Sequence, residues 1–278
     1  MQQTVQQANP TGSHIKYNNK GFDMKKLLQL GLACVALVLV ARSVAAAEEM
    51  VTETRQLDAR VLRVKLDGAI NIKLRQGNVA SLTISADKRQ LAKLTTSQSG
   101  DTLHIGTEGS GFKFNNAHTV RAELVLPALR ELSSDGVGSS EISGFTGEEL
   151  ELSLEGAGTM KVVCDYKRLK ASLGGVGSMH IWVSDNDSTD LDLRGAGYIT
   201  VGGRSKALRA SLGGLGSLNA QQFQSESVNL ELSGLGNATV NAKQNATLSL
   251  SGLGSVTVFG RPLNRNVSVD GLGKVSWK

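Results

Sequence analysis

The groups best suited to chemistry are four closely spaced carboxylates: Asp185, Asp187, Asp190 and Asp192. The Asp185-x-Asp187 spacing resembles the first ligand positions of an EF-hand calcium loop. Two later positions of that loop do not fit, because Asp190 stands where glycine is needed and Ala196 where glutamate is needed. We therefore interpret the segment as a solvated polar turn, with weak calcium binding by Asp185, Asp187 and Asp190 as the alternative.

A second candidate is a Gly-x-Gly tripeptide with Val, Ala or Leu in the middle, because glycine-rich turns can hold phosphate groups. It occurs eight times, whereas a phosphate loop is expected once, between a strand and a helix. Calcium-binding glycine repeats need an aspartate at a fixed position, and the residue before the first glycine varies among Asp, Glu, Gly, Arg and Ser. We therefore assign a structural role to these glycines: Gly136, Gly138, Gly156, Gly158, Gly175, Gly177, Gly195, Gly197, Gly214, Gly216, Gly234, Gly236, Gly252, Gly254, Gly271 and Gly273.

Other groups that could support catalysis are dispersed. His104, His118 and His180 have no Cys or Glu at ligand spacing, and no Gly-x-Ser-x-Gly motif is present. Solenoid enzymes that act on polysaccharides place acids beside aromatic sugar platforms, and nothing in the sequence clusters the aromatic candidates: Tyr166, Trp182, Tyr198 and Trp277. We predict a non-enzyme without catalytic residues, metal ligands or cofactors. A polysaccharide lyase or hydrolase is the alternative.

Composition narrows the class of protein. The chain has 278 residues, 40% of them apolar, which is enough for a buried core, and its 2 cysteines cannot form a disulfide framework. Five of the 30 basic residues but one of the 25 acidic residues lie within 1–47, so residues 48–278 carry a net charge of only +1. We therefore expect no nucleic-acid partner. Cys164 shares the alternation of Met160 and Val162, which predicts that its thiol is buried.

The tripeptides return every 18–20 residues, which is the signature of a solenoid. Apolar residues alternate on both sides of each tripeptide, as expected for strands with one buried face. The sequence thus predicts an all-β parallel β-helix or β-solenoid with about 19–20 residues per repeat. We expect the residue between the glycines to point into the core, beside one interior column: Leu173, Leu193, Leu212, Leu232 and Leu250. Since Leu169–Met179 resembles Leu208–Leu218, about 39 residues per full circuit is an alternative.

The N-terminal third lacks the tripeptide. Alternating runs predict strands in residues 48–130, separated by turn signals, with one helical turn at 88–93 and an exposed loop at 106–118. We predict that 48–130 is a less regular, strand-rich part that caps the repeat solenoid of 131–278, since an open end would expose strand edges.

The first 47 residues predict export. Lys25 and Lys26 precede an apolar stretch and the small residues Ala45–Ala47, so we interpret 24–47 as a signal peptide and 1–23 as a disordered upstream extension. We expect membrane contact only through this peptide before cleavage. The chain is expected to work in the periplasm or at the cell surface of a bacterium.

A series of short segments recurs in a characteristic order: Gly68–Leu74 with Gln76-Gly77, Leu82–Asp87, Asp101–Ile105 and Leu124–Leu129, followed by Ser134–Ser140 and the later Gly-x-Gly coils. In these segments the chain resembles the auto-transporter adhesin head, or GIN-domain, family of bacterial exported proteins. The resemblance implies a right-handed β-helix-like domain outside the cytoplasm with no established enzymatic activity, and it transfers no functional residues. We expect a binding module for a cell-envelope or extracellular component, either glycan or protein. An oligomer-forming structural module is a further alternative.

Overall fold

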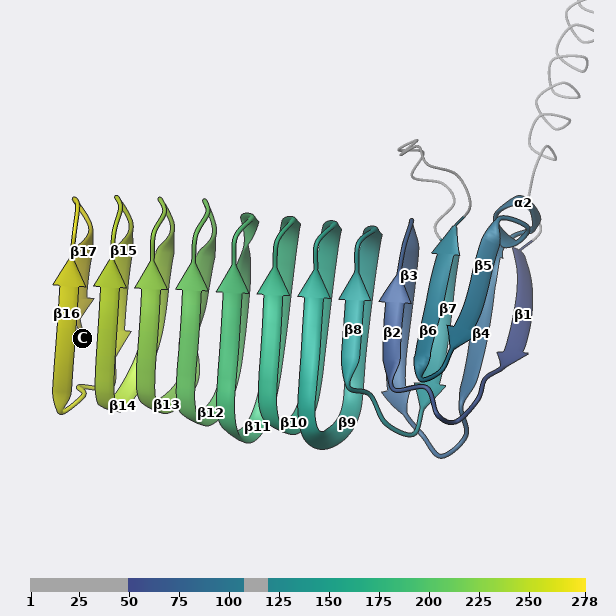
Figure 1. Cartoon of the computed structure of the whole chain (residues 1–278), viewed down its shortest axis with the longest axis horizontal. Coiled ribbons are helices and arrows are strands. Elements are labelled where there is room, and N and C mark those ends of the chain that lie inside the picture. The colour runs from purple at the N-terminus through teal and green to yellow at the C-terminus, as the bar shows by residue number, and fades with distance from the viewer. Residues whose placement is uncertain (1–49, 108–119) are drawn as a thin grey trace, which may run out of the picture. The chain divides into compact units, whose positions relative to one another are not determined.

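The computed structural model describes residues 50–107 and 120–278, which belong to one compact unit, Glu49–Lys278. The expected upstream extension and signal peptide, and most of the expected loop at 106–118, lie outside the described residues. The unit is built almost entirely of strands, stacked as a β-solenoid with a less regular N-terminal end (Figure 1).

Six long strands each run from one glycine tripeptide to the next: β9 (Val137–Leu154), β10 (Ala157–Leu173), β11 (Val176–Leu193), β12 (Ala196–Leu212), β13 (Ser217–Leu232) and β14 (Asn237–Leu250). Neighbouring strands pair in parallel, and the register aligns Val137 with Ala157 and Ala157 with Val176. One repeat of the glycine tripeptide therefore closes one full circuit. The alternative of 39 residues per circuit is wrong.

Each long strand bends halfway, where the parallel register shifts, for example between Cys164 and Arg168. The bend divides it into a first arm, after the tripeptide, and a second arm, before the next tripeptide. First arms stack into one sheet and second arms into the other, with the tripeptides along the upper edge in Figure 1. The last coils continue both sheets with shorter strands: β15 (Ser255–Phe259), β16 (Asn264–Val269) and β17 (Lys274–Trp277).

The core lies between the two sheets. The predicted leucine column is confirmed, because Leu173, Leu193, Leu212, Leu232 and Leu250 align in register and are at most 3% exposed. Alternation by two residues directs every second side chain inward, and stacking places identical side chains on one another. Burying each leucine stabilises the fold by roughly 1.5–3 kcal/mol, so the columns hold the coils together.

The tripeptide glycines lie where successive coils come closest. A Cβ atom at Gly195 would lie 1.9 Å from the carbonyl oxygen of Gly175, and one at Gly214 would lie 2.3 Å from that of Gly195. A positive φ angle is the exception here, since among these tripeptides only Gly138 (φ 146°) and Gly271 (φ 135°) adopt one. Glycine is needed at these positions mainly because successive coils pack closely at the tripeptides and leave no room for a side chain.

The N-terminal third extends both sheets, but not in chain order. Its strands are β1 (Met50–Gln56), β2 (Arg63–Leu66), β3 (Ile70–Gln76), β4 (Ser81–Asp87), β5 (Leu94–Ser99), β6 (Thr102–Thr107), β7 (Val120–Leu126) and β8 (Glu131–Ser134). β2 pairs in parallel with both β6 and β8, while β3 pairs in parallel with β7 and β9. The coil of β2 and β3 is thus enclosed between two coils that follow it in sequence.

Antiparallel strands close this end of the solenoid. β4 pairs with β7 and β1, and β5 pairs with β6, all antiparallel. The predicted helical turn is confirmed as α2 (Lys88–Leu91), with the Asp87 carboxylate accepting hydrogen bonds from the backbone N–H groups of Arg89 and Gln90. The less regular third therefore continues the stack and ends it in antiparallel strands.

Candidate binding surfaces

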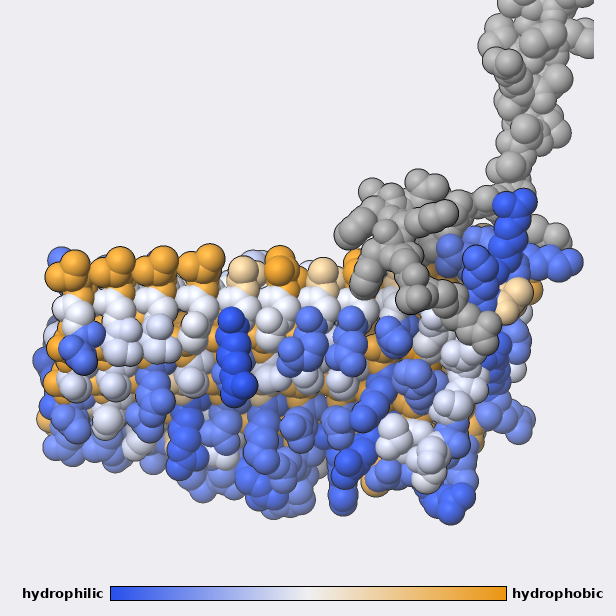
Figure 2. Space-filling view, turned by 45° about the horizontal axis from the view of Figure 1, so that its top comes forward, coloured by the Kyte–Doolittle hydropathy of each residue, from blue (hydrophilic) through white to orange (hydrophobic). Residues whose placement is uncertain are grey.

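The middle residues of the tripeptides form an apolar row that is exposed at every member except the half-buried Val137. We call this row the apolar crest: Val137, Ala157, Val176, Ala196, Leu215, Leu235, Leu253 and Leu272. Leu215 is 69% exposed, Leu235 57% and Leu253 60%. Figure 2 shows the row along the upper edge of the solenoid. The prediction that these residues point into the core is wrong. Side chains continue to alternate in direction through the tripeptide. Both glycines lie an even number of residues from the inward-facing Leu232, so they also face inward, and the residue between them faces water.

Two of the three candidate calcium ligands, Asp187 and Asp190, and the neighbouring Asp192 are each paired with a cation. Lys206 Nζ lies 2.7 Å from Asp187 Oδ1, Arg209 Nη1 lies 3.5 Å from Asp190 Oδ1, and Arg194 Nη2 lies 2.6 Å from Asp192 Oδ2. The hydrogen bond from Lys206 holds the pKa of the Asp187 carboxyl below its ordinary value. Within 50–107 and 120–278, no three His, Cys, Asp or Glu side chains converge as a metal site would require.

The expected polar turn at 184–187 is continuous strand in the structure. Asn186 is only 4% exposed, and its Nδ2 donates hydrogen bonds to Thr189 Oγ1 (2.7 Å) and to the carbonyl oxygen of Ser188 (3.2 Å). This segment is therefore a bend between two arms with one side chain folded inward, and not a loop that gathers ligands.

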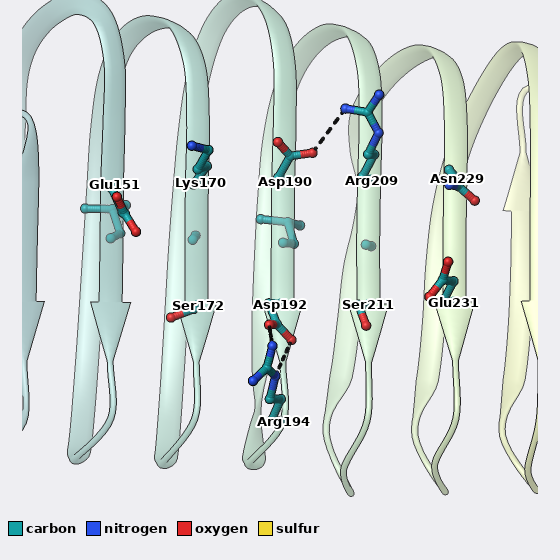
Figure 3. Close-up of a pocket in the computed structure, with 14 residues that line it drawn as sticks. Glu151, Lys170, Ser172, Asp190, Asp192, Arg194, Arg209, Ser211, Asn229 and Glu231 are labelled. Atoms are coloured by element: carbon teal, nitrogen blue, oxygen red, sulfur yellow. Dashed lines mark hydrogen bonds and ion pairs between the residues drawn. The ribbon is translucent and has the colours of Figure 1, made fainter.

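An open groove of about 440 Å³ runs across the outer face of the second arms. Its charged residues alternate in sign along one aligned row: Glu151, Lys170, Asp190 and Arg209. Figure 3 shows Asp190 directed to Arg209 and Asp192 directed to Arg194. Alternating signs on adjacent coils favour the observed register, because like charges would otherwise face each other.

Two acids of the groove, Asp190 and Asp192, do not form the opposed pair that glycoside hydrolysis needs. Asp190 and Asp192 project from one strand two residues apart, and each is engaged by a guanidinium. In a hydrolase, two carboxyl groups flank the scissile bond from opposite sides. The Asp190–Arg209 pair instead joins two adjacent coils.

The structure separates the aromatic candidates. Tyr166 is 2% exposed, and its hydroxyl donates a 2.5 Å hydrogen bond to the carbonyl oxygen of Leu129. Trp277 lies in the last coil, where the Arg265 guanidinium stands 4.5 Å from the ring centroid. Trp182 and Tyr198, in contrast, project from the first arms of adjacent coils. Two of the four therefore share one surface.

We call this surface the aromatic patch and define it as His180, Trp182 and Tyr198. Trp182 is 50% exposed and Tyr198 45%. The rings of His180 and Tyr198 meet edge to face with centroids 5.3 Å apart, and Tyr198 Oη lies 3.2 Å from His180 Nε2. The six-membered ring of Trp182 covers Gly202 on the next coil, where a Cβ atom would lie 2.3 Å from its Cζ3. Because Gly202 has no side chain, the indole rests on backbone and keeps half its surface in water.

The remaining candidate nucleophile is inert. Cys164 is buried, as predicted, and burial raises the pKa of its thiol to about 12, with a smaller contribution from Asp165. Burial and the raised pKa both disfavour the thiolate, which is the nucleophilic form of cysteine. His104 projects from β6 as an exposed side chain, and His118 lies outside the described residues.

These features define a parallel β-solenoid with a polar exterior, an exposed apolar crest and an aromatic patch. The chain belongs to the family "Putative auto-transporter adhesin, head GIN domain", which matches residues 62–262. No match exists among the curated proteins. Among residues 50–107 and 120–278, no helix is long and apolar enough to cross a bilayer.

Solved structures show the same fold. A "putative adhesin" from Parabacteroides distasonis is 17% identical, covers 84% of this chain and 98% of its own, and has a TM-score of 0.71. A "putative adhesin" from Bacteroides fragilis is 19% identical, with coverages of 84% and 98% and a TM-score of 0.65. A "Putative lipid binding protein" from Parabacteroides distasonis is 21% identical, covers 82% of this chain and 96% of its own, and has a TM-score of 0.63.

Proposed function

We propose that this protein is an exported, non-catalytic, adhesin-like module that binds carbohydrate of the cell envelope or the extracellular surface through the aromatic patch. The family membership supports adhesion as the class of function. The observation that carries the choice of ligand is Trp182, a half-exposed indole supported by backbone at Gly202.

The patch combines the two kinds of group that a sugar ring needs. The aliphatic C–H face of a pyranose packs on an aromatic ring, while its hydroxyl groups seek donors and acceptors at the rim. Trp182 supplies the ring, and His180 with the Tyr198 hydroxyl supplies polar atoms 3.2 Å apart. Lys161 and Thr200 align in register with His180 from the two neighbouring coils and extend this polar rim.

Replacing Trp182 with alanine is expected to weaken glycan binding at least tenfold, because the apolar face of the sugar loses its partner. The measurement is a glycan and envelope-polysaccharide array probed with the full chain, followed by titration of the strongest binder. Trp277→Ala is the matched control, since it removes the other tryptophan of the chain from the end of the solenoid and should leave the affinity unchanged.

A Trp277→Phe variant leaves Trp182 as the sole indole and allows a direct readout. Bound sugar should then change the tryptophan fluorescence with the same dissociation constant that the array titration gives. The proposal fails if no glycan binds, or if Trp182→Ala binds as well as the natural chain.

A further inference from the structure

The apolar crest lies along the edge formed by the glycine tripeptides, and not on the outer face that carries the aromatic patch. The proposed glycan site therefore does not explain why the crest is exposed. Its large members are held at equal height by backbone hydrogen bonds between coils. The Leu235 N–H donates to the Gly214 carbonyl oxygen and the Leu253 N–H to that of Gly234, both at 3.3 Å. Leu215, Leu235 and Leu253 thus form a straight row of like side chains on rigid backbone (Figure 2).

The residues on either side of this row carry no charge. Two positions before and two positions after each of these leucines stand only glycine, serine and asparagine: Gly213, Ser217, Ser233, Asn237, Ser251 and Ser255. Where a charge precedes the crest, at Asp135, Glu155 and Arg194, the crest residue is valine or alanine and not leucine (Val137, Ala157 and Ala196). Leu272, in the last coil, is the exception, with a charged residue on each side. Large apolar side chains and charge are therefore segregated along most of the edge.

The shape of the crest distinguishes between two partners that could cover it, a second copy of this chain and a lipid bilayer. Glycines on both sides make it one side chain wide, so two crests would touch along a line and fall short of the about 800 Å² per partner of a stable protein interface. A bilayer has no fixed shape and can enclose a ridge on both flanks. Insertion between lipid headgroups buries leucine without burying charge, which is the condition for stable interfacial binding.

We infer that the crest from Leu215 to Leu253 is a lipid-contacting edge that seats the solenoid in the headgroup region of a bilayer. Because no cation flanks these leucines, contact requires no anionic lipid and is insensitive to salt. This goes beyond the expectation that membrane contact is confined to the signal peptide.

The test attaches an environment-sensitive dye to a cysteine in place of Leu235, in the full chain with Cys34→Ser. The matched control carries the dye at Leu263, which is 85% exposed but lies in the turn between β15 and β16, at the opposite edge of the coil. The buried Cys164 does not compete for the dye. With phosphatidylcholine vesicles, the dye at 235 should shift to shorter wavelength and be quenched by a lipid-borne quencher, equally at low and high salt. The dye at 263 should do neither.

Adding Leu215→Ser and Leu253→Ser to the labelled chain should lower the apparent affinity for vesicles at least tenfold. The inference is overturned if the dye at 235 does not respond to lipid. It is also overturned if that dye shifts with protein concentration alone while the mass doubles, which would assign the crest to a second copy. Because Trp182→Ala should leave the lipid response intact, failure of the glycan proposal and failure of this inference are distinguishable.

Discussion

Replacing Gly214 with alanine is expected to destabilise the solenoid by about 1–3 kcal/mol or more, the range found for overpacked interiors. The added Cβ atom would lie 2.3 Å from the carbonyl oxygen of Gly195 and 2.6 Å from that of Arg194, so adjacent coils must separate. The midpoint of urea unfolding, followed by circular dichroism at a strand wavelength, measures this loss.

The neighbouring residue provides the control. A Cβ atom at Gly213 would meet only Ser233 Oγ, at an ordinary 3.8 Å, so Gly213→Ala should be neutral or slightly stabilising. Equal losses from the two substitutions would show that glycine is needed at this corner for conformational freedom, and not for the close approach of coils.

Leu232→Ala should cost about 2–5 kcal/mol, because it leaves a cavity between Leu212 and Leu250 in the central column. Leu235→Ala, three residues later, should change stability by less than about 0.5 kcal/mol. Both substitutions remove the same atoms, but Leu232 is 1% exposed and Leu235 57%. The midpoints of urea unfolding, compared between variants with the same m-value, distinguish the two substitutions. A large loss at 235 would mean that the crest is covered by part of the folded protein.

Much of the fold could be predicted from the sequence, because a repeat makes a local pattern into a global one. Once Leu232 faces inward, stacking at a 19–20-residue period places its equivalents above and below it. The outward direction of the crest side chains could also be predicted. Leu232, Gly234 and Gly236 lie at alternate positions and face the same side of the strand, so Leu235 faces the other side. The apolar character of leucine suggested the core instead. Only glycine fits at the inward-facing positions of the narrow tripeptide corner. The alternation of the strand therefore sets the direction of the residue between the glycines, even though that residue is apolar.

The order of the N-terminal coils could not be predicted, because β2 and β3 lack the tripeptide that aligns the other coils. The aromatic patch was missed for a related reason. Trp182 and Tyr198 are 16 residues apart, and they come to lie on adjacent strands only if one repeat, rather than two, closes a circuit. The supporting role of Gly202 depends on the inclination of one side chain, which no repeat pattern encodes.

The most direct test of the account is the reactivity of single cysteines introduced along the edge and along the column, in the Cys34→Ser chain. At pH 8 the buried Cys164, with a pKa of about 12, contributes no background. Cysteines at 215, 235 and 253 should react with a maleimide as fast as a free peptide thiol, while those at 212, 232 and 250 should react only when the protein is unfolded. Protected thiols on the crest together with reactive thiols in the column would contradict the arrangement of the coils described above.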